Sequence, residues 1–430
     1  MSKPTLVVSC PVDTYSGYGA RARDFVQSII EQDKYDVKIL SQKWGNTRFG
    51  YLKDHNIDSL SSRIIPQLTE KPDIWMQITI PNEFQKVGKY NIGVTAGIET
   101  DLCDPKWIEG CNRMDLIIAS SEHAKKGLED SKFELQDNKN NSIVQRISLT
   151  TKVEVLFEGI NTEMFAPKAF PVKLDLDDID EHFCFLVVGH WLPGKVGEDR
   201  KNIGFTIKSF LETFKNKPKV GRPALLLKVQ AGSGTSIMDR EELLDRIDAI
   251  RSTVKGDLPQ IYVLHGDMTQ EEVVELYNHG KVKAMISLSK GEGFGRPLLE
   301  FSMINKPIIS SAWSGPVDYL DKEFVKLIGG TLNTVDTSAV VSNMILKESK
   351  WFAPDPIQVG KALKDVHANY SKYKELAKRQ GHKSRTEFSY EKMRETLGNI
   401  LTQYVPEFPK QVEIKLPKLN KVVLPKLKKI

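Results

Sequence analysis

The sequence is poor in residues that cross-link a chain or anchor it in a membrane. It contains four cysteines among 430 residues, and no pair of them has the spacing of zinc ligands. We therefore expect no disulfide framework and a reducing, cytoplasmic setting. No apolar run approaches the ~20 residues that cross a bilayer. Met1–Pro4 leads straight into a strand-like run, so no secretory signal is expected.

Net charge is also low outside the C-terminal segment. Residues 409–430 contain seven lysines and one acidic residue, a net charge of +6, whereas the whole chain carries +5 and the remainder therefore −1. The segment repeats Leu-Pro-Lys-Leu. Three interpretations are open: an edge strand added to a partner's sheet, a contact for nucleic-acid phosphates, or disorder, which is the default expectation.

The length of the chain favours two domains, because one core rarely grows to 430 residues. Short apolar runs alternate with helical patterns, which is typical of parallel sheets with crossover helices. Strands are predicted at 5–10, 37–40, 74–80, 91–95, 116–120 and 153–156, then at 183–189, 224–229, 261–264, 283–288 and 307–310. Helices are predicted at 20–30, from 121, at 389–404, and from a capping box at Thr269 and Glu272 to Gly280.

The most informative segment is 289–300, which reads Ser-Lys-Gly-Glu-Gly-Phe-Gly-Arg-Pro-Leu-Leu-Glu. It follows a predicted strand, and its glycines would let the backbone turn tightly and approach a ligand closely. Pro297 fits the first position of a helix, whose unpaired N–H groups and dipole favour an anion. The segment therefore predicts an anion-binding loop between a strand and a helix.

Two carboxylates flank this loop, Glu292 in the turn and Glu300 on the helix. A carboxylate beside a phosphate is unfavourable unless it binds hydroxyls, and an acidic residue near a dinucleotide commonly holds a ribose diol. The combination predicts a ligand in which a nucleoside diphosphate is joined to a sugar. The alternative is a surface glycine loop in front of an ordinary helix.

The pattern Glu-Gly-Phe-Gly-x-Pro-x-x-Glu, a Glu-x7-Glu motif, resembles the donor-site signature of retaining glycosyltransferases with the GT-B architecture, family four type. The resemblance implies that Glu300 contacts the nucleotide ribose and that Glu292, a candidate catalytic residue, lies beside the transferred sugar. The loop residues Gly293, Phe294 and Gly295 are expected to bind the donor as well.

The same resemblance extends over about residues 5–405. It implies an α/β fold in which two Rossmann-like domains face each other across a cleft. The predicted divisions are an acceptor domain at 1–165, a linker at 166–182, a nucleotide-sugar donor domain at 183–388, a closing helix at 389–408 and a basic tail at 409–430.

Two cations, Arg200 and Lys201, precede a predicted helix and could neutralise a departing diphosphate. Lys201 matches the phosphate-binding lysine of the family. The family usually has an arginine after the first glycine of this domain, where this chain has His190. Arg200 or Lys195 is the candidate substitute. A solvated charge cluster is the alternative.

In the first half, Gly17 and Gly19 resemble the glycine loop that approaches the donor phosphate or the acceptor across the cleft, although such turns are common in α/β proteins. Glu99 and Asp101 are candidate catalytic residues that could bind acceptor hydroxyls. Some members of the family have a histidine here, and this chain does not. Helix capping by Asp101 or Asp104 is the competing interpretation.

Other candidate residues are less specific. His123 is expected at a helix start, and Trp313 either lies near the nucleotide base or packs at an interface. The pair Asp175-Leu176-Asp177 falls in the predicted linker, where it would not hold a diphosphate through a metal. We therefore expect no metal and no cofactor, with a nucleoside diphosphate sugar as substrate.

Residues 16–25 resemble glycosyltransferases encoded by large tailed phages, some of which modify hydroxymethylated DNA bases. Together with the basic tail, this makes DNA a candidate acceptor, while protein and saccharide acceptors stay open. The predicted function is a retaining, metal-independent glycosyltransferase, in the host cytoplasm if phage-encoded. The alternative is a binding or structural component docked to a virion through the tail; a weaker one is a sugar-nucleotide epimerase or phosphorylase.

Overall fold

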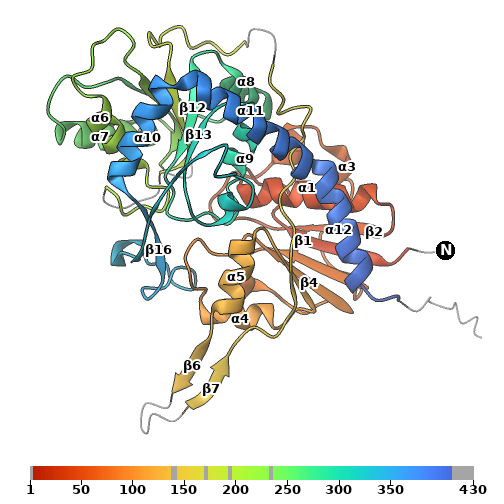
Figure 1. Cartoon of the computed structure of the whole chain (residues 1–430). Coiled ribbons are helices and arrows are strands. Elements are labelled where there is room, and N and C mark those ends of the chain that lie inside the picture. Colours follow the sequence, from red (N-terminus) through yellow and green to blue (C-terminus); the bar gives the residue numbers. More distant parts are fainter. Residues whose placement is uncertain (1–2, 137–142, 169–172, 192–195, 232–235, 409–430) are drawn as a thin grey trace, which may run out of the picture.

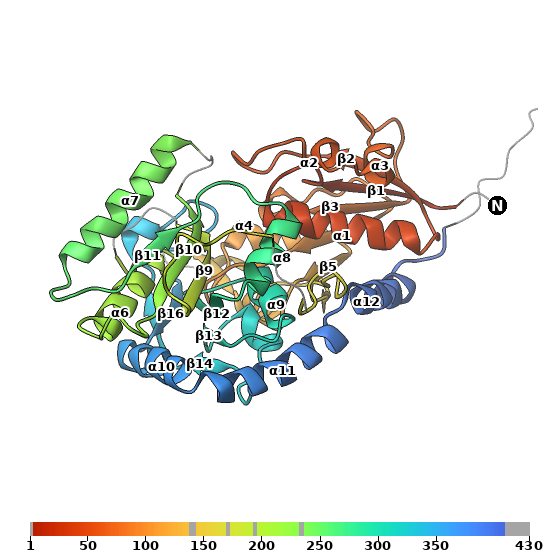
Figure 2. The ribbon, with the colours of Figure 1, turned by 90° about the horizontal axis from the view of Figure 1, so that it is seen from above.

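The computed structural model describes residues 3–136, 143–168, 173–191, 196–231 and 236–408. Two six-stranded sheets, parallel throughout, occupy separate halves of the molecule (Figures 1 and 2). The predicted α/β class with two parallel sheets is therefore confirmed. The predicted tail at 409–430 lies outside the described residues, as does Lys195.

The first sheet has the strand order β2-β1-β3-β4-β5-β8. Its strands are β1 (Thr5–Cys10), β2 (Asp36–Ser41), β3 (Ile74–Ile78), β4 (Tyr90–Thr95), β5 (Leu116–Ala119) and β8 (Val153–Val155). The helices of this half are α1 (Gly17–Glu31), α2 (Tyr51–Asp54), α3 (Asp58–Ser61), the 3-10 turn η1 (Pro81–Glu83), α4 (Pro105–Cys111) and α5 (Glu122–Asp130). One apolar cluster joins the sheet to α1, and a second joins its opposite face to α4 and α5.

The second sheet has the order β11-β10-β9-β12-β13-β14. Its strands are β9 (Cys184–His190), β10 (Ala224–Gln230), β11 (Ile261–Val263), β12 (Val282–Ser287), β13 (Ile308–Ser311) and β14 (Lys326–Ile328). Its helices are α6 (Ile203–Phe214), α7 (Ile237–Ser252), α8 (Gln270–Asn278), α9 (Arg296–Ser302), η2 (Gly315–Asp318), α10 (Pro356–Ala368) and α11 (Tyr370–Glu387). The strand order reverses between β9 and β12, and such a switch point opens a crevice at the carboxyl ends of those strands.

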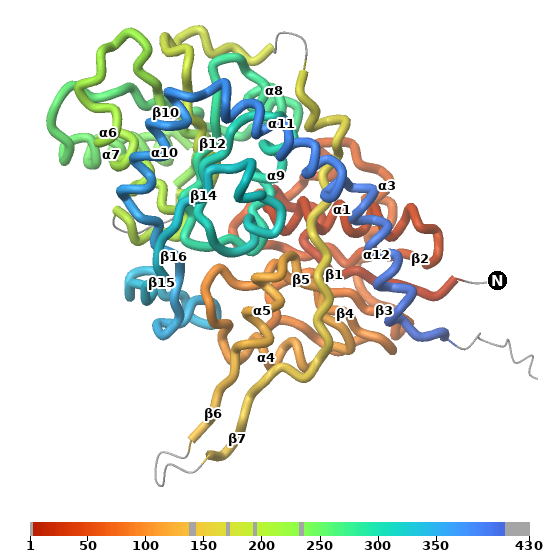
Figure 3. Tube along the Cα trace, in the orientation of Figure 1, coloured from red at the N-terminus to blue at the C-terminus, as the bar shows by residue number. Residues whose placement is uncertain are grey.

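The chain finally returns to the first half. Helix α12 (Tyr390–Tyr404), the predicted closing helix, lies beside α1 (Figure 3). Met393, Leu397 and Leu401 are buried in the same apolar cluster as α1 and the first sheet. The predicted linker is packed too, because Leu176 and Ile179 are buried in the apolar core of the second half. The four cysteines are buried free thiols.

Two hairpins were not predicted. β6 (Phe133–Gln136) and β7 (Ile143–Ile147) form a ribbon that projects from the first half (Figure 1). β15 (Gly330–Thr334) and β16 (Lys350–Pro354) form an antiparallel pair in the second half, and η3 (Thr337–Ala339) lies between them. None of the helices in the described ranges is both long and apolar enough to cross a membrane.

The segment between β15 and β16 reaches the first half. The Trp107 indole N–H donates to the Asn343 carbonyl oxygen at 2.8 Å. The Lys350 N–H donates to the Asp101 carboxylate at 2.6 Å, and the Asp101 N–H donates to the Lys350 carbonyl oxygen at 3.0 Å. This segment therefore fastens the second half of the chain to the first.

Truncation of Leu397 to alanine should destabilise the first half, because this fully buried side chain of α12 fills its core. Removing a buried leucine typically lowers the free energy of unfolding by about 2–5 kcal/mol. The measurement is urea denaturation followed by tryptophan fluorescence. Asn399→Ala, on the exposed face of the same helix, is the matched control and should change the midpoint little. Equal midpoints for both variants would show that α12 does not complete this core.

Candidate active site

Two loops meet at the switch point of the second sheet. The loop after β9 ends at Asn202, just before α6, and the loop after β12 is the glycine-rich segment 289–295. The Lys290 N–H donates to the Arg200 carbonyl oxygen at 2.8 Å, and the Asn202 side-chain amide donates to the Leu288 carbonyl oxygen at 3.1 Å. These bonds hold the predicted cations beside the predicted acidic loop.

A charge cluster forms where the two loops meet the loop after β4. The Lys201 Nζ lies 2.6 and 2.8 Å from the two carboxylate oxygens of Glu292. The Arg200 guanidinium lies 3.4 Å from Glu292 and 3.2 Å from Glu99. Glu99 comes from the first half of the chain, so this cluster of two acids and two cations spans both domains. All four were candidate site residues in the sequence, and the structure brings them together.

Burial and mutual attraction set the protonation of this cluster. Burial raises the pKa of Glu292, but Lys201 and Arg200 outweigh it and hold that pKa below its usual value. Burial lowers the pKa of Lys201, and Glu292 opposes the shift. The pKa of Arg200 is raised, since Glu99 and Glu292 outweigh its burial. Glu292 is thus an anion near neutral pH, held between two cations.

The glycines of the loop 289–295 allow its backbone to pack directly against the first domain. A Cβ added to Gly291 would lie 1.8 Å from the Glu99 carbonyl oxygen, and one added to Gly293 would lie 2.3 Å from the Ala96 carbonyl oxygen. The Ser120 hydroxyl lies within hydrogen-bond distance of the Ala96 and Gly293 carbonyl oxygens, at 2.9 and 3.1 Å. The close approach that the sequence predicts is therefore made to the other domain. Ser120 carried no local signal of this role.

The second motif carboxylate has its own cation. Glu300 lies on α9, and its carboxylate accepts from Arg296 Nε at 2.9 Å. The other arm of Arg296 reaches Asp24 at 2.6 Å and Glu158 at 3.4 Å. Burial raises the pKa of Glu300 to about 7, an effect that Arg296 opposes and Glu158 and Asp24 reinforce. Arg296 therefore ties α9 to the first half and holds the motif acid in place.

Glu300 and Arg296 line a cleft of about 380 Å3. Gly17, at the start of α1, forms part of the opposite wall, and His190 and Lys228 line the end near the second sheet. The cleft therefore lies between the two halves, at the carboxyl ends of β9 and β10. The start of α9, which follows β12, also lines the cleft, so the cleft reaches the crevice expected at the switch point between β9 and β12.

Solved structures share the overall fold of the chain. A glycosyltransferase from Rickettsia africae ESF-5 has a TM-score of 0.59 at 12% identity, covering 94% of this chain and 99% of that one. Sucrose-phosphate synthase from Thermosynechococcus elongatus gives 0.59 at 13% identity, with coverages of 93% and 98%. The Anabaena protein HepE, in complex with UDP and glucose, gives 0.57 at 12% identity, with coverages of 93% and 100%. No sequence family and no curated protein matches the chain.

The fold is that of GT-B glycosyltransferases.

Within the GT-B fold, the glycines predicted near the donor start α1 and do not form a separate loop. Ser16 caps the helix, and its hydroxyl accepts from the Gly19 N–H at 2.9 Å. Gly17 faces the cleft. Gly19 instead packs on a neighbouring turn, because a Cβ there would lie 2.4 Å from the Thr14 carbonyl oxygen. Pro297 likewise stands second in its helix, which begins at Arg296 after Gly295 at φ 91°.

Several predicted residues of the GT-B cleft have structural partners. Phe294 is buried against Tyr319, with ring centroids 5.0 Å apart. Asp101 bonds to the β16 backbone, as described above, and Asp104 caps α4. Trp313 packs at the interface.

The Trp313 ring stacks on Phe352 at 6.2 Å and meets the His123 ring edge-on at 4.7 Å. His123 follows Ser121, the cap of α5, so it stands at a helix start as predicted, and burial lowers its pKa to about 4. Across the described ranges, no group of three or more His, Cys, Asp or Glu side chains is placed to hold a metal ion.

Replacing Gly291 with alanine should force the two GT-B domains apart, because the new methyl group would meet the Glu99 backbone. Overpacking of this kind costs about 1–3 kcal/mol, which thermal unfolding would detect. Gly280→Ala is the matched control, since nothing lies within 4 Å of a Cβ at that position. An unchanged melting temperature for the Gly291 variant would show that this contact does not form in solution.

Proposed function

We propose that this chain is a retaining glycosyltransferase that moves a sugar from a nucleoside diphosphate to an acceptor hydroxyl without a metal ion. The observation that carries the proposal is the placement of the two motif acids. Glu300 lines the interdomain cleft, while Glu292 is held by Lys201 and Arg200 at the start of α6. Structures of HepE with UDP-glucose and with UDP and glucose, on the same fold, support a nucleotide sugar as the donor.

In this proposal the donor lies along the carboxyl ends of β9 and β12. Glu300 accepts hydroxyl protons of the ribose, and the diphosphate lies by Arg200 and Lys201. The start of α6, a helix of twelve residues, adds a positive partial charge there. Cations fixed beforehand stabilise the charge that develops on the leaving diphosphate, so the chemistry needs no divalent ion.

In the transfer step, the bond between the sugar C1 and the β-phosphate oxygen breaks as the acceptor oxygen bonds to C1 on the same face. The acceptor proton passes to the leaving phosphate oxygen, because Glu292 and Glu99 are both engaged in ion pairs with cations. Product anomer by NMR tests retention, and turnover in EDTA tests metal independence. An inverted anomer, or loss of activity on chelation, would contradict those two features.

The main test is a screen of nucleotide sugars by thermal shift and by release of nucleoside diphosphate, since a ligand that binds the native state stabilises it. Glu300→Gln should weaken donor binding about ten- to a hundredfold, because hydrogen bonds to a charged group are lost. The isosteric change tests charge with little change in shape. A screen with no hit, or a variant with unchanged affinity, would refute the assignment.

The pKa of about 7 of the Glu300 carboxyl also predicts that donor binding depends on pH. The ionised carboxylate accepts two ribose hydroxyls, whereas the protonated form is the weaker partner, so donor binding should tighten as pH rises from 6 to 8. The intact nucleotide sugar does not titrate in this range. Glu300→Gln should remove the dependence.

The acceptor side is proposed to be a hollow of about 700 Å3 in the first half. It lies at the carboxyl ends of β1, β2 and β3, and its lining includes Trp44, Trp75 and Gln77. The Trp44 ring stacks on Tyr18 at 4.0 Å, and the Tyr18 hydroxyl accepts from the Ala96 N–H at 3.0 Å. Ala96 contacts Gly293 of the donor loop, so Trp44, Tyr18 and Ala96 connect the hollow to the proposed reaction centre.

A hydroxymethylated DNA base is the candidate acceptor that the basic tail and the phage resemblance favour. A DNA acceptor should make binding fall steeply with salt, and deletion of 409–430 should reduce that slope, since each neutralised phosphate contributes about −0.9 to it. Filter binding across a salt series measures both. Transfer to a free saccharide at a rate that does not depend on salt concentration would reject DNA as the acceptor.

A further inference from the structure

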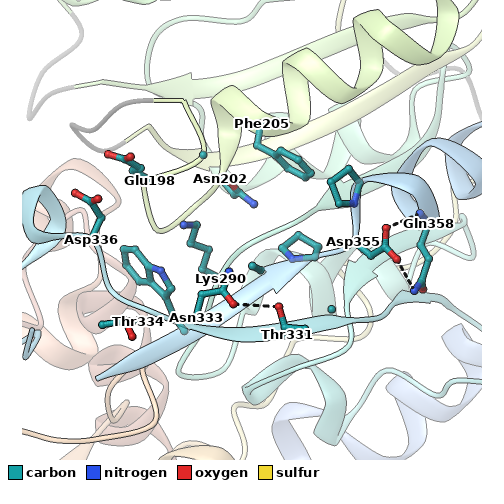
Figure 4. Close-up of a pocket in the computed structure, with 16 residues that line it drawn as sticks. Glu198, Asn202, Phe205, Lys290, Thr331, Asn333, Thr334, Asp336, Asp355 and Gln358 are labelled. Carbon is teal, nitrogen blue, oxygen red and sulfur yellow. Dashed lines mark hydrogen bonds between the residues drawn. The ribbon is translucent and has the colours of Figure 1, made fainter. Parts of the chain in front are cut away.

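A second hollow lies on the other side of the donor loop, inside the C-terminal domain (Figure 4). Its volume is about 690 Å3, within the range of roughly 300–1,000 Å3 that is usual for small-molecule sites. The start of α6, the donor loop, the β15–β16 hairpin and the start of α10 form its walls. It is therefore separate from the cleft that Glu300 lines.

Lys290 extends into this hollow between the start of α6 and the hairpin (Figure 4). Lys290 is only 8% exposed, and its Nζ lies 4.5 Å from the centre of the Trp351 ring. In the described part of the chain, the Lys290 ammonium has no hydrogen bond and no ion pair within 4 Å, although its backbone groups are bonded. An indole face compensates a buried cation only in part.

A second buried group at the same place lacks a partner. Asn202 is 2% exposed, and its side-chain oxygen has no hydrogen-bond partner among the described residues. Burial lowers the pKa of Lys290, which the carboxylates of Asp199, Glu198 and Asp336 oppose. A ligand that brings a negative group to Lys290 would restore the interaction that burial removes.

The remaining lining indicates the rest of the ligand. Thr331, Asn333 and Thr334 supply hydroxyl and amide groups, and Phe205 supplies an apolar ring. Such a lining suits a ligand that carries several hydroxyl groups. The acids near Lys290 limit the ligand's charge, because Glu198 and Asp336 would repel a second negative charge.

We propose that this hollow binds a sugar acid of the uronate class, with its single carboxylate on Lys290 and its hydroxyls on the hairpin and the start of α6. A neutral sugar would leave the Lys290 ammonium without a direct ion pair, since the nearby carboxylates act on it only from beyond contact distance. A sugar phosphate would place a dianion beside two carboxylates.

The site would act on the donor loop through bonds already present. The Phe352 N–H of β16 donates to the Lys290 carbonyl oxygen at 2.9 Å, and the Lys290 N–H donates to Arg200, which pairs with Glu292. A ligand on Lys290 and on β15 would tighten this connection. Its binding should therefore change donor affinity, and the donor should change its affinity by the same factor.

The test is a ligand-observed NMR titration of the full chain with three probes: glucuronate, glucose and glucose 6-phosphate. The first two differ only at C6, and the third carries a dianion. Glucuronate should bind saturably and at least about tenfold more tightly than the other two, and saturating UDP should not displace it. Lys290→Met keeps the alkyl stem on Trp351 but removes the charge, so it should weaken glucuronate about ten- to a hundredfold.

Lys290→Arg retains the charge and should retain binding. Asn333→Tyr, on an exposed strand position, should block the mouth of the hollow without disturbing the core. Thermal unfolding confirms that each variant is folded. No glucuronate binding, equal binding of glucose, displacement by UDP, or an unchanged affinity in both Lys290→Met and Asn333→Tyr would each overturn the proposal. Because the readout is binding, failure here is distinct from failure of the transferase assignment.

Discussion

The arrangement of the two domains depends on backbone segments that lie closer together than side chains would allow. Gly291 and Gly293 present bare backbone to the carbonyl oxygens of Glu99 and Ala96. Only at this separation can Arg200 bridge Glu99 of one domain and Glu292 of the other. The geometry of the candidate active site is thus a consequence of packing between loops, and the charges occupy positions that this packing defines.

The charge cluster has a cost for any anionic ligand. In the free protein Glu292 and Glu99 together already neutralise Lys201 and Arg200, so an anionic ligand must compete with a carboxylate that is held 2.6 Å from Lys201 Nζ. The affinity for such a ligand is then a difference between two similar interactions. Such an exchange favours moderate affinity and ready release of the ligand. Arg296 and Glu300 form a comparable pair in the interdomain cleft.

Features that depend on a few neighbouring residues could be predicted from the sequence. The strands at the centre of both sheets, the capping box of Thr269 and Glu272, and the loop 289–300 fall into this class. Features that depend on distant residues could not. Arg296 meets Asp24 and Glu158, which lie far from it in sequence, and Ser120 meets Gly293 across the domain interface.

The same limit explains smaller differences. Phe294 stands in the motif but turns into the core, because the rings of Tyr319 and Phe157 lie beneath the loop. The glycines at 17 and 19 enter the first turn of α1, because Ser16 caps the helix earlier than the apolar pattern predicts. The hairpin of β15 and β16 lacks a turn signal and is held by contacts with another domain.

The return of α12 to the first domain has a consequence for biosynthesis. A nascent chain that has not yet extended through residue 404 exposes the apolar groove that Leu397 and Leu401 later fill. The domain that is synthesised first is therefore among the last to be completed.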